Sequence, residues 1–104
     1  MLYSEFTKRY NPNQKISNTG YKSIINQHDR IQIQFNLYCV DKNIPQTSFS
    51  KFCLRKHYTL DDCIKIRNNA MDRINKQIRI KNKMNEPFTT DEIECLRLEL
   101  WLEE

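Results

Sequence analysis

Turn-forming residues are scarce in this chain, which contains one glycine and three prolines among its 104 residues. An all-β domain needs many tight turns, and tight turns draw heavily on glycine and proline. The length is that of a single domain, and a hydrophobic content of 38% allows a core of ordinary size for such a domain. We therefore expect an all-α fold, a small bundle of about four helices.

The charges are spread unevenly along the chain. Residues 1–50 carry six basic and three acidic groups, residues 51–83 carry ten basic and three acidic groups, and residues 84–104 carry one basic and seven acidic groups. The net charge of +4 therefore conceals a basic middle and an acidic tail. The basic middle favours a partner that carries phosphates.

Three segments follow from this distribution. Residues 1–20 are rich in asparagine and show no helix or strand period, which predicts a flexible arm that Tyr3, Phe6 and Tyr10 could attach to the domain. Residues 21–85 form the expected helical domain. Residues 86–104 form the expected acidic, amphipathic C-terminal helix.

The segment 21–41 fits two periods. One set of apolar residues recurs at helical spacing: Tyr21, Ile24, Ile25, His28, Ile31, Phe35 and Tyr38. Another set alternates as in a strand: Ile31, Ile33, Phe35, Leu37 and Cys39. We favour the helix, because a lone strand without an obvious partner would leave its backbone groups unpaired. The strand stays open as the alternative.

Three further helices are expected. The first begins at Pro45 or is capped by Thr47, and it ends near His57. Thr59 caps the second, which carries an apolar stripe from Cys63 to Ile78 and ends near residue 84. Thr89 and Glu92 form the capping-box signature of the third. That last helix is expected to bury Ile93, Leu96, Leu100 and Trp101.

The stretch from Phe49 to Arg67 resembles the short helix-turn-helix segments of DNA-binding proteins from transposons, phages and plasmids. The residues that carry the resemblance are Phe52-Cys53, then four residues, then Tyr58-Thr59, then Cys63 and Ile66. In such segments a small residue lets two helices cross closely, and apolar residues of the second helix face the first. The resemblance covers about residues 47–70. It implies a DNA-binding function in transcription regulation or in a mobile element.

The resemblance also implies roles for individual residues. Thr59, Leu60, Asp61, Lys65, Asn68 and Asn69 would face the major groove, where asparagine suits adenine and lysine suits guanine. The residues Lys51, Arg55, Lys56 and Arg73 would contact phosphates. Arg67 and Lys76 belong to the same basic surface. The alternative is that these residues form only the solvated face of an amphipathic helix. The side chains of Asp61 and Asp62 either cap the second helix or show that this face does not meet DNA.

Metal binding and catalysis find little support in the sequence. The spacing of Cys53, His57 and Cys63 does not match the cysteine pairs of structural zinc sites, so we expect no metal and no cofactor. No phosphate loop, zinc-protease motif or nucleophile elbow is present, and we expect no enzyme. The chain also lacks an apolar run of transmembrane length and a signal peptide, which predicts a cytoplasmic protein.

The acidic tail admits three roles. It closes the core, pairs with a second copy through Ile93, Leu96, Leu100 and Trp101, or binds a partner protein. Our leading hypothesis is a DNA-binding regulator or accessory protein, with DNA a better candidate than RNA. The alternative is a small phage- or plasmid-encoded inhibitor that occupies a nucleic-acid-binding partner protein.

Overall fold

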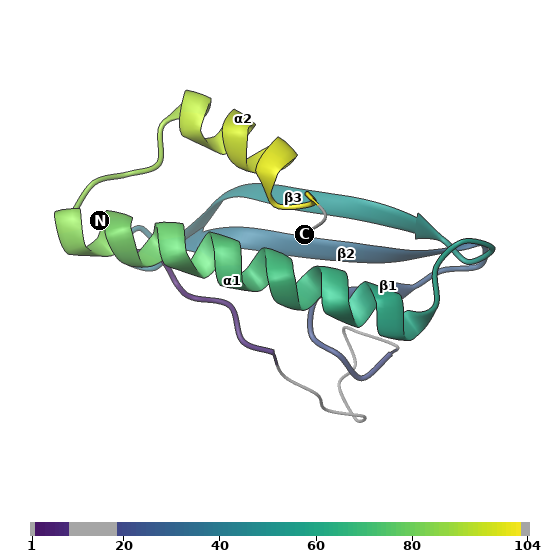
Figure 1. The fold of residues 1–104 in the computed structure, drawn as a ribbon. Helices are drawn as coiled ribbons and strands as arrows, with labels where there is room; N and C mark the ends of the chain where they lie inside the picture. Colours follow the sequence, from purple (N-terminus) through teal and green to yellow (C-terminus); the bar gives the residue numbers. More distant parts are fainter. Residues whose placement is uncertain (1, 9–18, 103–104) are drawn as a thin grey trace.

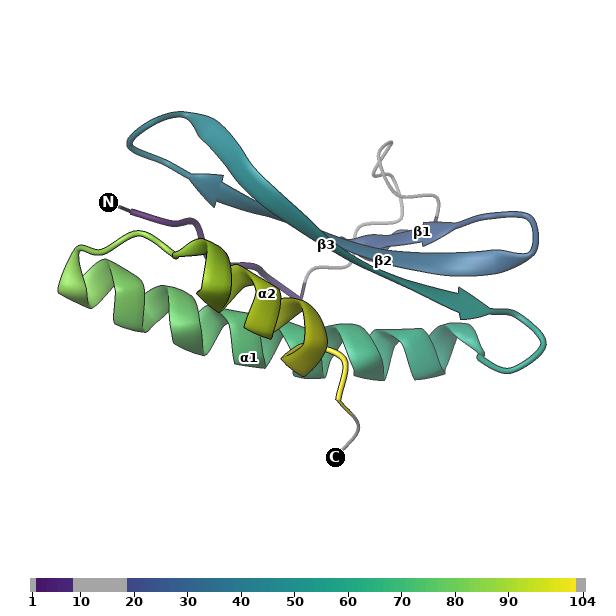
Figure 2. The same ribbon diagram turned by 90° about the horizontal axis from the view of Figure 1, so that it is seen from above.

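A three-stranded antiparallel sheet and two helices make up the protein. The computed structural model describes residues 2–8 and 19–102. The elements are β1 (Ile24–Asn26), β2 (Arg30–Cys39), β3 (Ile44–Leu54), α1 (Leu60–Met84) and α2 (Thr90–Glu99). The strand order is β1-β2-β3, and both helices lie on the same side of the sheet (Figure 1, Figure 2). The fold is therefore a two-layer α/β arrangement, and the expected all-α bundle of four helices is wrong.

The segment for which we favoured a helix forms the central strand, β2. Its odd-numbered residues Ile31, Ile33, Phe35, Leu37 and Cys39 are buried, as the alternating pattern indicated. The partners that the sequence did not reveal are the flanking strands. Residues of β1 pair with β2 from Ile31 to Ile33, and β3 pairs with its whole length. The backbone groups are thereby satisfied, which removes the objection to a strand.

The helix expected from Pro45 to His57 is also wrong, because residues 44–54 form β3. This strand is at the edge of the sheet, where a proline need not donate a hydrogen bond. A register shift between Leu37 and Tyr38 places Pro45 opposite Tyr38 and gives β3 an extra residue. Phe52 and Cys53 are thus neighbours on a strand, with no first helix. The structure therefore contradicts the helix-turn-helix.

The sheet makes its tight turns with residues other than glycine. Asn43 in the β2–β3 connection and Ser23 before β1 have φ angles of 53° and 70°. Asparagine adopts this left-handed conformation more readily than most residues, and a serine can reach it at a modest cost. The scarcity of glycine therefore did not exclude a sheet.

The two C-terminal helices match the sequence analysis. Thr59 caps α1, and the Thr59 side chain accepts a hydrogen bond from the Asp62 amide at 3.1 Å. Thr89 caps α2 and accepts from the Glu92 amide at 3.2 Å. At the other end of α1, Asn85 takes the left-handed conformation with φ 54° and ends the helix. Both capping predictions are confirmed.

The core lies between the sheet and the helices. From α1 it takes Cys63, Ala70, Met71, Ile74 and Ile78, and from the C-terminal region Ile93, Leu96 and Leu100. Trp101 stacks on Phe35 with ring centroids 5.8 Å apart. The tail residues considered for dimerisation therefore face their own core. No helix in the described chain combines the length and the apolar character needed to cross a bilayer.

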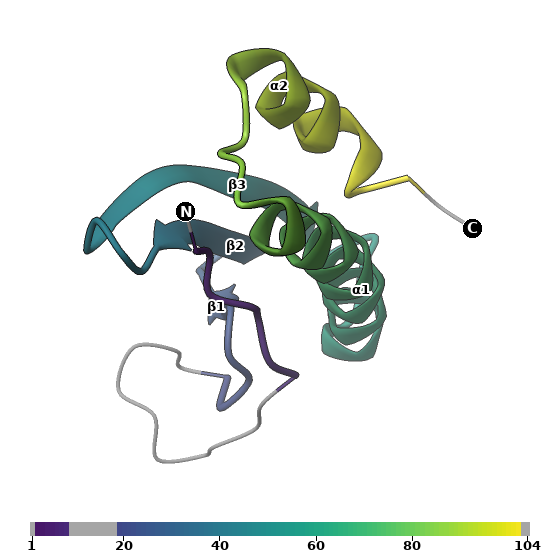
Figure 3. The same ribbon diagram turned by 90° about the vertical axis from the view of Figure 1, so that its left-hand side faces the viewer.

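Part of the expected N-terminal arm belongs to the folded domain. Residues 2–8 run beside the sheet and α1 (Figure 3), and Tyr3 is buried. Phe6 packs edge-on against Phe35, with ring centroids 5.1 Å apart. The remaining residues expected in the arm include Tyr10, which lies outside the described residues. The two aromatic anchors that can be located are thus in contact with the domain.

The alternation of β2 predicts that substitutions at adjacent residues have very different effects on the free energy of unfolding. Ile33→Ala removes a fully buried side chain and should lower the free energy of unfolding by about 2–5 kcal/mol. Gln34→Ala changes a side chain of the opposite face and should alter it by no more than about 0.5 kcal/mol. Urea denaturation followed by circular dichroism measures both values. Equal effects of the two substitutions would contradict the strand.

A pH-dependent contribution to stability is expected from the ion pair that joins α2 to α1. The Nζ atom of buried Lys81 lies 2.6 Å from Glu92 Oε2. The pKa of Glu92 is lowered from its ordinary value of 4.5 by the hydrogen bond from Lys81, and further by that from the Thr89 backbone. The stabilisation is present above the ordinary pKa and is lost as pH falls through the lowered one.

Wild type should therefore be more stable than Glu92→Gln near about pH 7, with the difference shrinking as Glu92 is protonated. Denaturant titrations across this range test the expectation. Thr90→Ala, at the first residue of the same helix, serves as a control whose effect should not vary with pH. A difference between wild type and Glu92→Gln that stays constant into the acid range would show that the ion pair is not responsible.

Candidate nucleic-acid interface

The face of the sheet turned away from the helices presents polar side chains. We call it the open face. It is made of the even-numbered residues of β2, their partners on β3 and one residue of β1: Arg30, Gln32, Gln34, Asn36, Tyr38, Pro45, Ser48, Ser50, Phe52, Leu54 and Ile25. The same alternation that buries the odd-numbered residues of β2 places these residues outward. Neither helix covers this face (Figure 2).

Amide side chains form a connected row along the open face. Gln27, from the β1–β2 turn, donates through Nε2 to Gln32 Oε1 at 3.0 Å. Gln32 donates to Gln34 at 3.5 Å, and Gln34 donates to Asn36 at 3.4 Å. Each amide has two N–H groups and an acceptor oxygen, so one bond to each neighbour leaves capacity for a ligand. The row holds the amides in order while leaving them able to bind.

Arg30 is the charged residue of the open face. Its guanidinium lies over the Phe52 ring, 4.5 Å from the centroid, and its Nε donates to Gln27 Oε1 at 3.1 Å. No carboxylate belongs to the set of residues that defines the open face. The neighbouring segments carry the cations Lys22, Lys42, Arg55 and Lys56 and the acids Glu5, Asp29 and Asp41, and Asp29 Oδ1 lies 3.7 Å from Arg30 Nε. The face is therefore neutral to positive, which suits a polyanion.

The spacing along β2 suits a stack of base pairs. Outward-facing residues on a strand lie about 6.6–6.8 Å apart, because each residue advances the strand by about 3.3–3.4 Å. Base pairs of B-DNA rise by about 3.4 Å. Gln32, Gln34 and Asn36 therefore follow one another at intervals of about two base-pair steps.

Two of the residues predicted to bind DNA stabilise the fold. Arg67 is buried, donates to the carbonyl oxygen of Lys22 at 3.1 Å and packs over the Tyr21 ring. Burial lowers the pKa of Arg67. The Nη1 atom of Arg73 donates to the carbonyl oxygens of Glu99 and Leu100, each at 3.0 Å, at the C-terminal end of α2. These contacts use both guanidinium groups inside the molecule.

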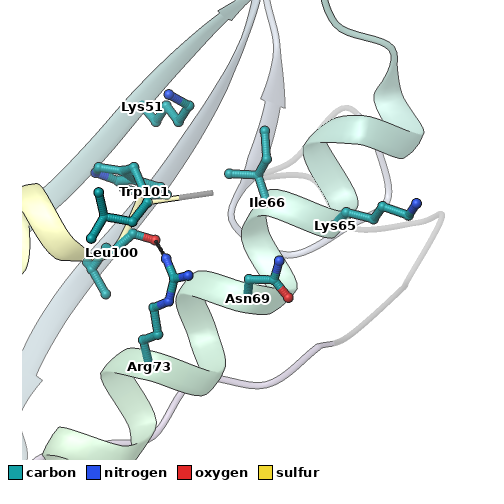
Figure 4. Close-up of a pocket in the computed structure, with 8 residues that line it drawn as sticks. Lys51, Lys65, Ile66, Asn69, Arg73, Leu100 and Trp101 are labelled. Carbon is teal, nitrogen blue, oxygen red and sulfur yellow. Dashed lines mark hydrogen bonds between the residues drawn. The ribbon is translucent and has the colours of Figure 1, made fainter. Parts of the chain in front are cut away.

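A second group of predicted residues surrounds a cavity of about 290 Å³ between α1 and the C-terminal end of the described chain. Lys51, Lys65, Asn69 and Arg73 line it together with Trp101 (Figure 4). Lys51 reaches it from the helix side of β3, and the Lys65 side chain points away from Trp101 (Figure 4). This group is separated from the open face by the sheet itself.

The remaining predicted residues divide between the turn and the helix. Arg55 donates to the carbonyl oxygen of Gln27 at 3.0 and 2.9 Å, and Lys56 is exposed beside it, so both adjoin the open face. The other three lie on or before α1: Thr59 is its N-cap, Asn68 accepts from Arg67, and Lys76 is exposed. Of the ten predicted residues, Arg55 and Lys56 are therefore the two next to the open face.

The acidic pair at the start of α1 has a structural role. Asp62 accepts a hydrogen bond from the Thr59 amide at 2.9 Å and completes the capping box. Hydrogen bonds from the Thr59 backbone and side chain lower the pKa of Asp62. Asp61 lies in the same first turn, where the helix dipole favours a negative charge. Neither side chain belongs to the open face.

The residues weighed as metal ligands do not converge. Within residues 2–8 and 19–102, no group of three or more His, Cys, Asp or Glu side chains could hold a metal ion. Cys53 and Cys63 are buried, and burial raises the pKa of Cys63 to about 12. His57 is exposed in the turn before α1, and His28 is exposed in the β1–β2 turn rather than on the apolar side of a helix.

No family model, no curated protein and no solved structure matches the chain.

The buried position of Arg67 predicts that charge reversal there acts on folding. Arg67→Glu should lower the free energy of unfolding by about 3–5 kcal/mol, because it breaks a buried, hydrogen-bonded charge. Lys65→Glu, two residues earlier and exposed, should change it by at most about 0.5 kcal/mol. Thermal melts followed by circular dichroism compare the two variants. A wild-type melting temperature for Arg67→Glu would show that the guanidinium is not part of the core.

Proposed function

We propose that the protein binds double-stranded DNA through the open face of the sheet, as a regulator or accessory factor of transcription or of a mobile element. The observation that supports this proposal is the amide row with Arg30 at one end, on a sheet face that includes no carboxylate. This proposal assigns DNA contact to the sheet in place of the predicted helix.

The chemistry of the amide row suits base edges in the major groove. Glutamine and asparagine form paired hydrogen bonds with adenine, and arginine does so with guanine. The major groove admits a β-ribbon as well as a helix, and several DNA-binding proteins use strands in this way. Gln32, Gln34 and Asn36 would then read adenines about two base pairs apart, with Arg30 near a guanine.

Phosphate contacts would come from the turns at the ends of the strands. Arg55 and Lys56 follow β3 and lie at the end of the sheet that holds the β1–β2 turn. Lys22 lies just before β1, and Lys42 lies in the β2–β3 turn. Basic side chains at both ends of a reading surface can bind the backbone on either side of a groove. They would supply the part of the affinity that depends on salt.

Duplex DNA fits the open face better than RNA. Sheet surfaces that bind single-stranded RNA stack two or three bases on aromatic rings, whereas on the open face the Phe52 ring is already stacked by the Arg30 guanidinium and Tyr38 is half-buried. The major groove of an RNA duplex is too deep and narrow for side chains to read. An intracellular location belongs to the same proposal, since the target is DNA.

The triple substitution Arg30→Ala, Gln32→Ala and Gln34→Ala tests the proposal. It should weaken binding to the preferred duplex by about tenfold or more, because each paired contact to a base contributes about 1–3 kcal/mol. The preferred duplex is first selected from a random pool with the wild-type protein. Fluorescence anisotropy over a range of salt concentrations then measures affinity, which should fall as salt rises.

The matched control changes three exposed lysines of α1, with Lys65, Lys76 and Lys83 replaced by alanine. Their loss should reduce affinity far less than the triple substitution, and without changing the selected sequence. If the triple variant binds the selected duplex as wild type does, or if wild type binds no duplex at low salt, the proposal fails. Retention of one host protein in place of DNA would support the alternative of a protein-binding inhibitor.

A further inference from the structure

The N-terminal segment, residues 2–8, is held through its backbone rather than as an ordinary part of the core. It lies extended beside α1 and the edge of β2 (Figure 3). Two asparagines of α1, Asn75 and Asn82, hold its peptide groups from one side. The sheet pairs with the same backbone from the other side.

Each asparagine binds both polar groups of one residue in the segment. Asn82 accepts from the Tyr3 amide at 2.7 Å and donates to the Tyr3 carbonyl at 3.0 Å. Asn75 does the same with Phe6, at 2.8 Å in both directions. Asn75 is buried, with 8% of its surface exposed, so its amide depends on this partner. A side-chain amide that pairs with a peptide group in this way accepts any residue except proline, which lacks the N–H donor.

The spacing of the two asparagines matches an extended chain. Seven residues of α-helix separate them, a distance of about 10.5 Å at 1.5 Å per residue. Three residues of extended chain separate Tyr3 from Phe6, which is about 10 Å. The helix therefore presents its two amides at the interval that separates Tyr3 from Phe6. Polar groups three residues apart on a regular strand point to opposite edges, so the segment leaves the strand conformation after the bridge at Tyr3.

The sheet completes the backbone recognition. β1 pairs with β2 only from Ile31 to Ile33, and the N-terminal segment takes over the same edge farther along. The Ser4 amide donates to the Tyr38 carbonyl at 3.2 Å, and the Val40 amide donates to the Leu2 carbonyl at 2.8 Å. Tyr3 forms an isolated bridge with Cys39. This is strand addition, a recurring mode of peptide recognition.

Two aromatic anchors give the segment its sequence preference. The Tyr3 hydroxyl donates to Gln46 Oε1 at 2.7 Å and accepts from the Phe88 amide at 2.9 Å, and the Tyr3 ring packs on Phe88. Phe6 packs edge-on against Phe35. Two exposed ion pairs also join the segment to α1: Arg79 contacts Glu5 at 2.8 Å, and Lys8 contacts Asp72 at 2.7 Å.

We propose that the groove between α1 and the edge of β2 is a peptide-binding site for an extended segment with tyrosine and phenylalanine three residues apart. The chain's own N-terminal segment fills it in cis, and the same segment of a second copy can fill it in trans. The contacts described above that hold the segment all come from residues 35–88. The inference is independent of DNA binding by the open face.

The test weakens the segment that occupies the site and then supplies the intact one. The protein is the full chain with Tyr3→Ala and Phe6→Ala, and the probe is a peptide of residues 1–8 labelled at its C-terminus. A tethered segment acts at an effective concentration in the millimolar range, so wild type should bind the probe far more weakly than the variant does. Fluorescence anisotropy measures binding, and thermal melts measure the stabilisation that the peptide confers.

Three controls make the result specific. A peptide in which the tyrosine and phenylalanine are alanines should not bind. Adding Asn75→Ala and Asn82→Ala to the protein should weaken binding by about tenfold or more, because buried amide contacts are lost. Adding Asn69→Ala, an exposed asparagine of the same helix, should change binding little. If the protein variant is unfolded by itself, the titration is followed as peptide-induced folding.

The inference is overturned if about 1 mM peptide neither binds the variant nor restores its fold, since that matches the concentration of the tethered segment. It is also overturned if the alanine peptide acts equally well. Mixed wild-type chains carrying two different tags provide the measurement for a second copy. If the chains exchange N-terminal segments when they are unfolded and refolded as a mixture, affinity capture of one tag should also recover chains that carry the other tag. This co-capture should disappear with Asn75→Ala and Asn82→Ala.

Discussion

The rest of the structure depends on β2 being paired on both edges while burying one face. Pairing with β1 and the N-terminal segment on one edge and β3 on the other satisfies its backbone, which lets a strand run through the middle of a small domain. The period of two then sorts its side chains. Ile33 and Phe35 meet the helices, while Gln32 and Gln34 must face away from them. The hydrophobic core and the amide row are thus two consequences of one register, and a shift of one residue would exchange them.

The sequence predicted those elements whose signals are local. Thr59 and Thr89 begin helices because a capping side chain acts within three residues of itself, and both boxes are present. A strand is different, because its stability comes from partners elsewhere in the chain. The alternation from Ile31 to Cys39 was visible, but its partner segment contains Pro45, which we interpreted as a helix start. An edge position and a register shift make that proline compatible with β3. The small number of glycines led to the wrong fold class for a related reason, since Asn43 and Ser23 adopt positive φ angles beside the strands.

The candidate site was less predictable than the fold, because charge in a sequence does not show which cations are already engaged. Arg67, Arg73 and Lys81 contribute to the basic count of residues 51–83, yet each is bound within the molecule. The open face carries little charge, and its signal is the even-numbered amides of β2. Those amides could be found once the strand was accepted over the helix, since on a helix Gln32, Gln34 and Asn36 would point in different directions. An error in secondary structure therefore became an error about which surface is the candidate for binding.

The two proposed sites share β2: the open face is formed by its outward side chains, and the proposed peptide groove lies along its edge. They meet at a cavity of about 220 Å³, which is lined by Ser4, Glu5 and Phe6 of the N-terminal segment and by Gln34, Asn36 and Tyr38 of the open face. A bound peptide that replaces the segment would line the cavity with the same backbone. Such an exchange is therefore not expected to change the proposed affinity for DNA. An empty groove removes one side of the cavity and the Ser4 bond to the Tyr38 carbonyl. Peptide occupancy can therefore change DNA affinity only if Gln34 and Asn36 are held differently when the groove is occupied and when it is empty. Any such effect is reciprocal, so DNA would change the affinity for the peptide by the same factor.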